Sequence, residues 1–181
     1  MRNAFIPYIS NNTEVKTTFV DKEYELYENL IINDTKIDML GLMGRTAYNF
    51  ANHLEGLEGK DLTDYKIILF LGGADQMNIV KHKNMEVVVD KYIATSIARF
   101  GKENIILITP VKDTRNYYIY EEVKALYKPF ITYMQKRCRE EGLEHHELYS
   151  IIGETTIDDL QDAFHIKNEF YPILYKYLGL I

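Results

Sequence analysis

Cysteine, proline and long apolar runs are scarce in this sequence, and the scarcity of each excludes certain classes of protein. A single cysteine, Cys138, excludes an internal disulfide framework and is typical of a reducing compartment. Four prolines among 181 residues, of which 46% are hydrophobic, argue against long disordered segments. No apolar run has the length of a membrane span, and residues 1–12 lack the pattern of a signal peptide. We therefore expect a globular protein of the cytoplasm with no membrane partner.

Positive charge is also in short supply. The chain carries 21 Lys and Arg against 27 Asp and Glu, which gives a formal net charge of −6. Basic residues gather at 81–84 and 135–142, but acidic residues lie close to both clusters, as in a solvated surface. This balance gives no electrostatic reason to expect nucleic acid as a partner.

Strand-like and helix-like patterns alternate along the chain without a linker or repeat, so we predict one domain over residues 1–181. Strands are predicted over 4–10, 35–42, 65–73, 104–111 and 145–152. Helical spacing of apolar residues predicts helices over 22–32, 45–57, 85–101, 119–142 and 169–181. This alternation predicts an α/β protein, a three-layer α/β/α sandwich of flavodoxin-like type with a parallel sheet of about five strands.

Ligands of such sheets bind at the carboxyl ends of the strands. That rule directs attention to Ser10, Gly41–Thr46, Gly72–Asn78, Pro110–Arg115 and the loop before the last helix. In "LGLMGRTAYNF" (40–50), a strand passes through two glycines into a helix, whose free amides favour an anion. The glycine spacing is shorter than the dinucleotide fingerprint and no P-loop lysine follows, so a tight turn without a ligand stays an alternative.

Two further stretches have residue types suited to catalysis. "LGGAD" (71–75) follows an apolar strand, and its backbone can approach a ligand closely; a glycine-lined turn with a helix-capping aspartate is the alternative. In "DDLQDAFHIK" (158–167), Asp162 and His165 stand three residues apart. Such a pair can provide an imidazole general base oriented by its acid, although on a helix the same spacing only places both on one exposed face.

In their order along the chain, these blocks resemble the SGNH/GDSL family of esterases and acyltransferases, over nearly the whole sequence. "GRT" (44–46) is similar to the family's second block, "LGGAD" to the third, and "DAFHI" (162–166) to the last. "YIS" (8–10) stands where the family has G-D-S. The resemblance implies Ser10 as nucleophile, His165 as base and Asp162 as its orienting acid, with no metal and no organic cofactor.

The resemblance also implies an oxyanion hole formed by Ser10, Gly44 and Gly73. The third-block asparagine of the family is replaced by Ala74, and Asn78 is the first candidate to supply the missing donor. The G-D that precedes the family's serine is replaced as well, by Tyr8 and Ile9. Loss of one oxyanion donor typically costs about 10²–10³ in rate.

The expected function is therefore hydrolysis or O-acyl transfer on a small or carbohydrate ester. Two alternatives stay open: a binding or scaffold protein that keeps the fold without catalysis, and a nucleotide-binding domain that uses Gly41–Thr46. His145 and His146 could bind a metal only with a distant acid. Fifteen tyrosines suit sugar stacking, a core or a dimer seam, so a homo-oligomer is also left open.

Overall fold

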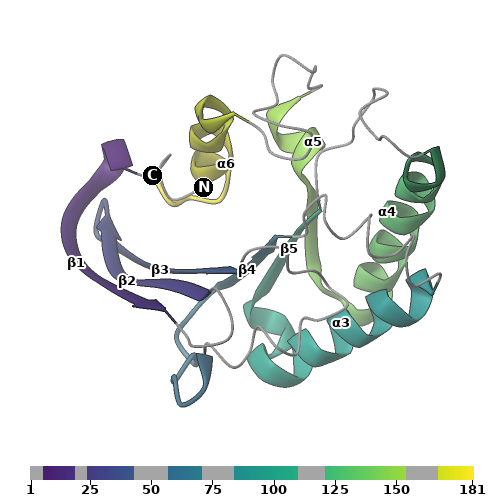
Figure 1. The fold of residues 1–181 in the computed structure, drawn as a ribbon, viewed down its shortest axis with the longest axis horizontal. Helices are drawn as coiled ribbons and strands as arrows, with labels where there is room; N and C mark the ends of the chain where they lie inside the picture. The colour runs from purple at the N-terminus through teal and green to yellow at the C-terminus, as the bar shows by residue number, and fades with distance from the viewer. Residues whose placement is uncertain (1–5, 19–23, 43–56, 71–83, 110–120, 154–166) are drawn as a thin grey trace. The chain divides into compact units, whose positions relative to one another are not determined.

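The computed structural model describes residues 6–18, 24–42, 57–70, 84–109, 121–153 and 167–181, and its ribbon is drawn in Figure 1. Its contacts group the chain into two compact units. Unit 1 comprises Met1–Gly44 and Ile166–Ile181, and unit 2 comprises Arg45–His165. The molecule is mixed α/β, and the described strands form two three-stranded sheets, one in each unit. A single five-stranded parallel sheet is not confirmed.

Unit 2 contains a parallel sheet with the strand order β4-β5-β6. Its strands are β4 (Ile67–Phe70), β5 (Ile105–Thr109) and β6 (Glu144–Glu147). The helix α3 (Met85–Phe100) connects β4 to β5, and α4 (Glu121–Glu141) connects β5 to β6. Here the predicted alternation of parallel strands with helices is confirmed, and the apolar sequences of β4 and β5 suit strands of a parallel sheet.

The core of unit 2 lies between this sheet and the two helices, which Figure 1 shows on the same side of β5. Ile105 and Leu107 of β5 enter it together with Phe130 and Met134 of α4. The alternate β5 residues Ile106 and Ile108 point to the other face of the sheet and are buried as well. Every residue of β5 is therefore buried, as its uninterrupted apolar sequence predicts.

Unit 1 contains an antiparallel sheet with the order β1-β2-β3. The strands β1 (Ile9–Thr18), β2 (Tyr24–Ile32) and β3 (Thr35–Leu42) follow one another as neighbours. Between β2 and β3, Asn33 and Asp34 have φ of +44° and +65°. Positive φ at both central residues is the mark of a type I′ hairpin turn, whose twist matches that of the strands it joins.

The middle strand of unit 1 contains a β-bulge at Asn29. The register of β2 against β3 shifts between Tyr27 and Leu30, and Asn29 has a φ of +59°. Its amide donates a hydrogen bond of 2.6 Å to Oδ1 of Asp38 on β3, so a side chain satisfies this donor. On either side of the bulge, Leu26 and Leu30 are buried.

The C-terminal helix α6 (Tyr171–Tyr177) belongs to unit 1, although it is the last element of the chain. It follows the short 3₁₀ helix η5 (Asn168–Phe170), and its Leu174 and Tyr175 are almost completely buried. Burial raises the pKa of the Tyr175 phenol, and the nearby phenols of Tyr171 and Tyr8 raise it further. The two ends of the sequence therefore share one core region.

Several predicted elements are corrected by the structure. The predicted helix over 22–32 is wrong, because residues 24–32 form the strand β2, paired on both sides. The predicted first strand over 4–10 is also wrong: a 3₁₀ helix, η1 (Ile6–Tyr8), precedes β1. The predicted last strand over 145–152 divides into β6 and the short helix α5 (Leu148–Ile152). Of the predicted helix over 45–57, residues 45–56 lie outside the described residues.

Within the part of the chain that the structure describes, no helix is both long enough and apolar enough to cross a bilayer.

Candidate functional site

The carboxyl edge of the parallel sheet in unit 2 is the candidate site. Because β4, β5 and β6 are parallel, their last residues Phe70, Thr109 and Glu147 lie at the same edge. Ligands of parallel α/β sheets bind at this edge, beyond the ends of the strands. The chain continues from β4 into "LGGAD" and from β5 into Pro110–Arg115, and both of these stretches lie outside the described residues.

Thr109 fixes the end of β5 against β6. Its side chain is completely buried, and its hydroxyl donates a hydrogen bond of 3.4 Å to the backbone carbonyl of His146. In the sheet register Thr109 stands opposite Glu147, and the hydrogen bond joins the residue before it, His146, to the end of β5. A buried hydroxyl needs such a partner, because an unpaired one costs about 1–3 kcal/mol.

Glu147, the last residue of β6, is hydrogen-bonded to a side chain of α4. Its carboxylate accepts a hydrogen bond from the side-chain amide of Gln135. Gln135 and Glu147 are both half-buried. Thr109 and Gln135 therefore hold two consecutive residues at the end of β6, just before the chain enters α5.

Charged groups also surround the first residue of β6. The carboxylate of Glu144 lies 3.1 Å from Nε2 of His146 and 3.6 Å from Nζ of Lys66. The hydrogen bond with His146 and the charge of Lys66 keep the pKa of Glu144 below its ordinary value. Glu144 and His146 are two residues apart on a strand, so their side chains lie on the same face of the sheet.

His145 lies on the opposite face of β6, with a different environment. Its Nε2 is buried and has no hydrogen-bond partner within the described ranges. Burial lowers the pKa of His145 to about 4, and the neighbouring charges of His146 and Arg139 lower it further. The ring is therefore neutral at pH 7. Over those same ranges, no group of three His, Cys, Asp or Glu side chains is arranged to hold a metal ion.

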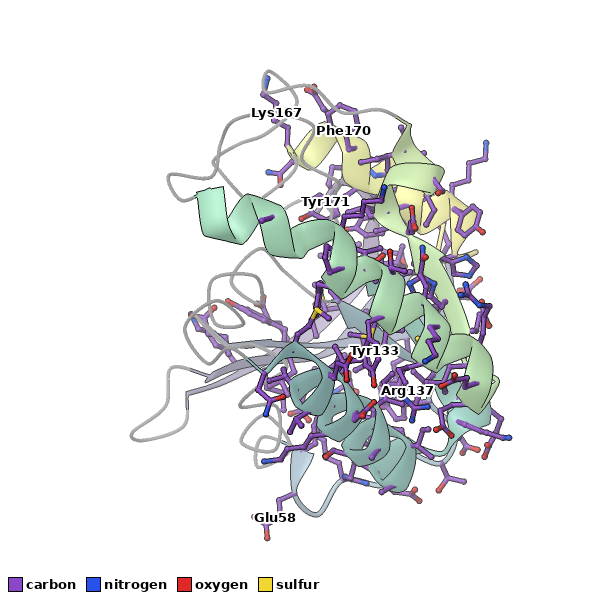
Figure 2. The ribbon with its side chains drawn as sticks, turned by 90° about the vertical axis from the view of Figure 1, so that its right-hand side faces the viewer. Glu58, Tyr133, Arg137, Lys167, Phe170 and Tyr171 are labelled. Atoms are coloured by element: carbon purple, nitrogen blue, oxygen red, sulfur yellow. The ribbon has the colours of Figure 1, made fainter. Side chains whose placement is uncertain are left out.

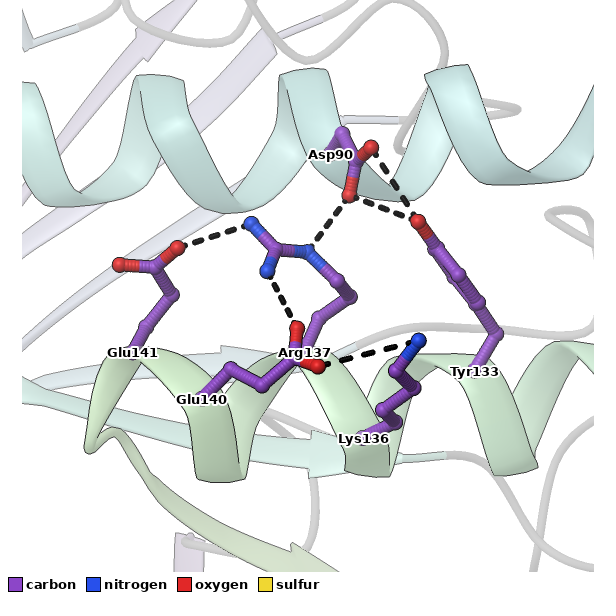
Figure 3. Close-up of polar contacts among 6 residues, drawn as sticks. All are labelled: Asp90, Tyr133, Lys136, Arg137, Glu140 and Glu141. Atoms are coloured by element: carbon purple, nitrogen blue, oxygen red, sulfur yellow. Dashed lines mark hydrogen bonds and ion pairs between the residues drawn. The ribbon is translucent and has the colours of Figure 1, made fainter.

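A network of charged side chains fastens α4 to α3 and so holds both helices over the sheet. Figure 2 shows Tyr133 and Arg137 of α4 directed at α3, and Figure 3 shows their contacts. Arg137 Nε lies 2.7 Å from Oδ1 of Asp90 on α3, and the Tyr133 hydroxyl lies 3.2 Å from both carboxylate oxygens of Asp90.

The rest of the Arg137 guanidinium is paired within α4. Its Nη1 and Nη2 donate to Glu140 at 2.6 Å and to Glu141 at 2.8 Å (Figure 3). Hydrogen bonds with Glu140 and Asp90 raise the pKa of Arg137 above its ordinary value. All three nitrogens of the guanidinium therefore donate to carboxylates of the protein itself. We infer that this network joins the two helices and does not bind an external anion.

Among the predicted catalytic and oxyanion-hole residues, only Ser10 falls within the described residues. The others, Gly44, Gly73, Asn78, Asp162 and His165, lie outside them, and so does Ala74. Ser10 is the second residue of β1, and the register skips it between the pairs Ile9–Ile32 and Asn11–Ile31, so β1 bulges there. Its exposed hydroxyl donates a hydrogen bond of 2.9 Å to the carbonyl of Ile31. Ser10 thus stands near the start of an antiparallel strand, whereas the sequence places it at the end of a parallel one.

The two other serines of the chain have contrasting environments. Ser96 is buried within α3 and donates its hydroxyl to the carbonyl of Tyr92 at 2.8 Å, so it is unavailable to a substrate. Ser150 is exposed on α5, three residues after the end of β6. Ser150 falls within the predicted strand 145–152, but it lies on α5, close after the carboxyl end of β6.

Comparison with known proteins adds no assignment: no family model matches the chain, and no curated protein matches it.

Proposed function

We propose that the protein is an ester hydrolase or O-acyltransferase of the SGNH type, acting on a small or carbohydrate ester. The observation that supports this most is the parallel arrangement of β4 and β5, with Phe70 beside Ile108 in the register. It places the last residue of β4 beside the end of β5 at one sheet edge, and in the sequence a glycine-containing segment follows β4 and a proline-containing segment follows β5. The segment that follows β4 begins with "LGGAD" (71–75), which resembles the third block of the SGNH/GDSL family.

The proposed fold around this edge is the three-layer α/β/α sandwich. One helical layer is present in the described chain, since α3 and α4 cover the face of β5 that includes Ile105 and Leu107. Burial of Ile106 and Ile108 on the opposite face supports a covering layer there as well. We propose that the parallel sheet extends beyond β4–β6 to about five strands.

In the proposed reaction, the Ser10 hydroxyl attacks the ester carbonyl and transfers its proton to His165. Asp162 orients the imidazole and stabilises the imidazolium. Backbone amides of Ser10, Gly44 and Gly73, with the side chain of Asn78, stabilise the oxyanion of the tetrahedral intermediate. Departure of the alcohol takes the proton from His165 and leaves an acyl-enzyme, which water or a second alcohol then cleaves. No cofactor takes part in these steps.

The Ser10 hydroxyl must first break the hydrogen bond that it donates to the carbonyl of Ile31. A hydroxyl is activated by a base that accepts its proton, and a backbone carbonyl is too weakly basic to do so. Because the Ser10 side chain is exposed, rotation about its Cα–Cβ bond can release the hydrogen bond at small cost. We therefore propose that substrate binding or His165 displaces this contact.

The same hydrogen bond favours the second candidate function, a non-catalytic binding or scaffold protein. In that case the role of Ser10 is structural: its hydroxyl donates a hydrogen bond to the carbonyl of Ile31 at the bulge of β1. The loss of G-D before the serine, and of the third-block asparagine at Ala74, agrees with this alternative. The two functions differ in whether Ser10 can be acylated.

The decisive experiment measures hydrolysis of a short aryl ester by the wild type and by Ser10→Ala, with Ser150→Ala as the matched control. Both serines are exposed, so neither substitution removes core packing. We expect Ser10→Ala to lower kcat by at least about 10³-fold and Ser150→Ala to leave it unchanged, because loss of a nucleophile removes the whole covalent pathway.

Labelling with a fluorophosphonate, followed by peptide mass mapping, separates the remaining outcomes. A phosphonyl group on Ser10 supports the esterase, and a group on Ser150 would move the nucleophile to α5. An unlabelled wild type without turnover would support the binding or scaffold protein. His165→Ala is the companion variant: it should abolish both labelling and turnover if the imidazole is the base.

A further inference from the structure

We draw no further inference here: the strongest candidate, the half-buried imidazole of His145 on the core face of β6, offers one unpartnered ring nitrogen and a lowered pKa, with no cluster of three metal-ligating side chains in the described ranges to complete a site.

Discussion

Unit 2 is one continuous stretch of chain, whereas unit 1 is assembled from both of its ends. The sheet of unit 2 is parallel, and each described connection between its strands passes through a helix that packs on the same face. The sheet of unit 1 is antiparallel, with a two-residue turn between β2 and β3 and its helix supplied from the far end of the sequence. Unit 1 therefore takes its helix α6 from a distant part of the sequence, whereas α3 and α4 of unit 2 lie between the strands that they cover.

The difference has an energetic origin. A βαβαβ segment brings its own covering helices, so the sheet face on which they pack can be buried without a distant part of the chain. A three-stranded antiparallel sheet has one apolar face that needs a cover. In unit 1 the buried side chains of β2 and those of α6 are separated by well over half of the sequence. Unit 1 should therefore be the more sensitive of the two to changes at the C-terminus.

Removing the C-terminal residues 167–181 should have the largest effect. It deletes Leu174 and Tyr175, which are almost completely buried, and should leave β1–β3 without protection while β4–β6 keep theirs. Hydrogen exchange resolved by peptide is the measurement. Deletion of residues 178–181 alone is the control, since none of these side chains is buried. Equal loss of protection in both sheets would show that the units do not unfold separately.

Matched core truncations should compare the two units directly. Leu107→Ala on β5 and Leu30→Ala on β2 each remove a side chain with at most 1% exposure, and each should lower the free energy of unfolding by about 2–5 kcal/mol. Val87→Ala, at a site 56% exposed, should change it by less than about 0.5 kcal/mol.

Peptide-resolved exchange shows where each core truncation acts. Leu30→Ala should deprotect unit 1 alone, and Leu107→Ala should deprotect unit 2. If Leu107→Ala instead opened β1–β3 first, the two cores would be energetically coupled and the comparison would fail.

Acid should weaken unit 2 through His145. The folded pKa is about 4 and the ordinary value is 6.5, so between these pH values the unfolded chain binds more protons at this residue. This residue's contribution to stability is therefore complete above pH 6.5 and is lost as the pH falls towards 4. The loss should amount to at most about 3 kcal/mol.

His145→Phe tests this effect, because it retains a ring at the position and removes the titration. Urea unfolding at a series of pH values should give a shallower pH dependence for the variant than for the wild type. Identical slopes would show that His145 is protonated as readily in the folded protein as in the unfolded chain.

The smallest expected effect lies at the hairpin tip of unit 1. Asp34 adopts a φ of +65°, which glycine tolerates better than any other residue. Asp34→Gly creates the Asn-Gly pair preferred in type I′ turns and should stabilise unit 1 by roughly 0.5 kcal/mol. Glu58→Gly, at an exposed position of unit 2, is the control and should not raise the melting temperature of the protein. A loss of stability in Asp34→Gly would argue against the type I′ geometry.

Much of unit 2 could be predicted from its sequence because local patterns there have one interpretation. The apolar run before Thr109 predicts a strand buried on both faces, and the amphipathic segment that ends before Gly101 predicts a helix. The pattern does not predict the end of β6 at Glu147, because apolar residues continue from Leu148 to Ile152 and do not distinguish a strand from a helix.

In unit 1 the local pattern is ambiguous. The segment 22–32 has apolar residues at helical spacing, yet Leu26, Leu30 and Ile32 also alternate as a strand requires. The pair Asn33-Asp34 was the available signal for a hairpin, since such residues favour two-residue turns. The bulge at Asn29 cannot be read locally, because it depends on Asp38 of the neighbouring strand.

By itself the sequence determined the α/β class, the strands β4 and β5 and the helices α3 and α4 of unit 2, and a set of candidate catalytic residues that is still a prediction. Those elements follow from propensity and periodicity, which act over a few neighbouring residues. Tertiary structure alone decided that 24–32 is a strand, that α6 belongs with the N-terminal sheet, and that the Ser10 hydroxyl pairs with Ile31. Each depends on a partner distant in sequence, because the free energy of pairing and burial arises only when the two segments meet.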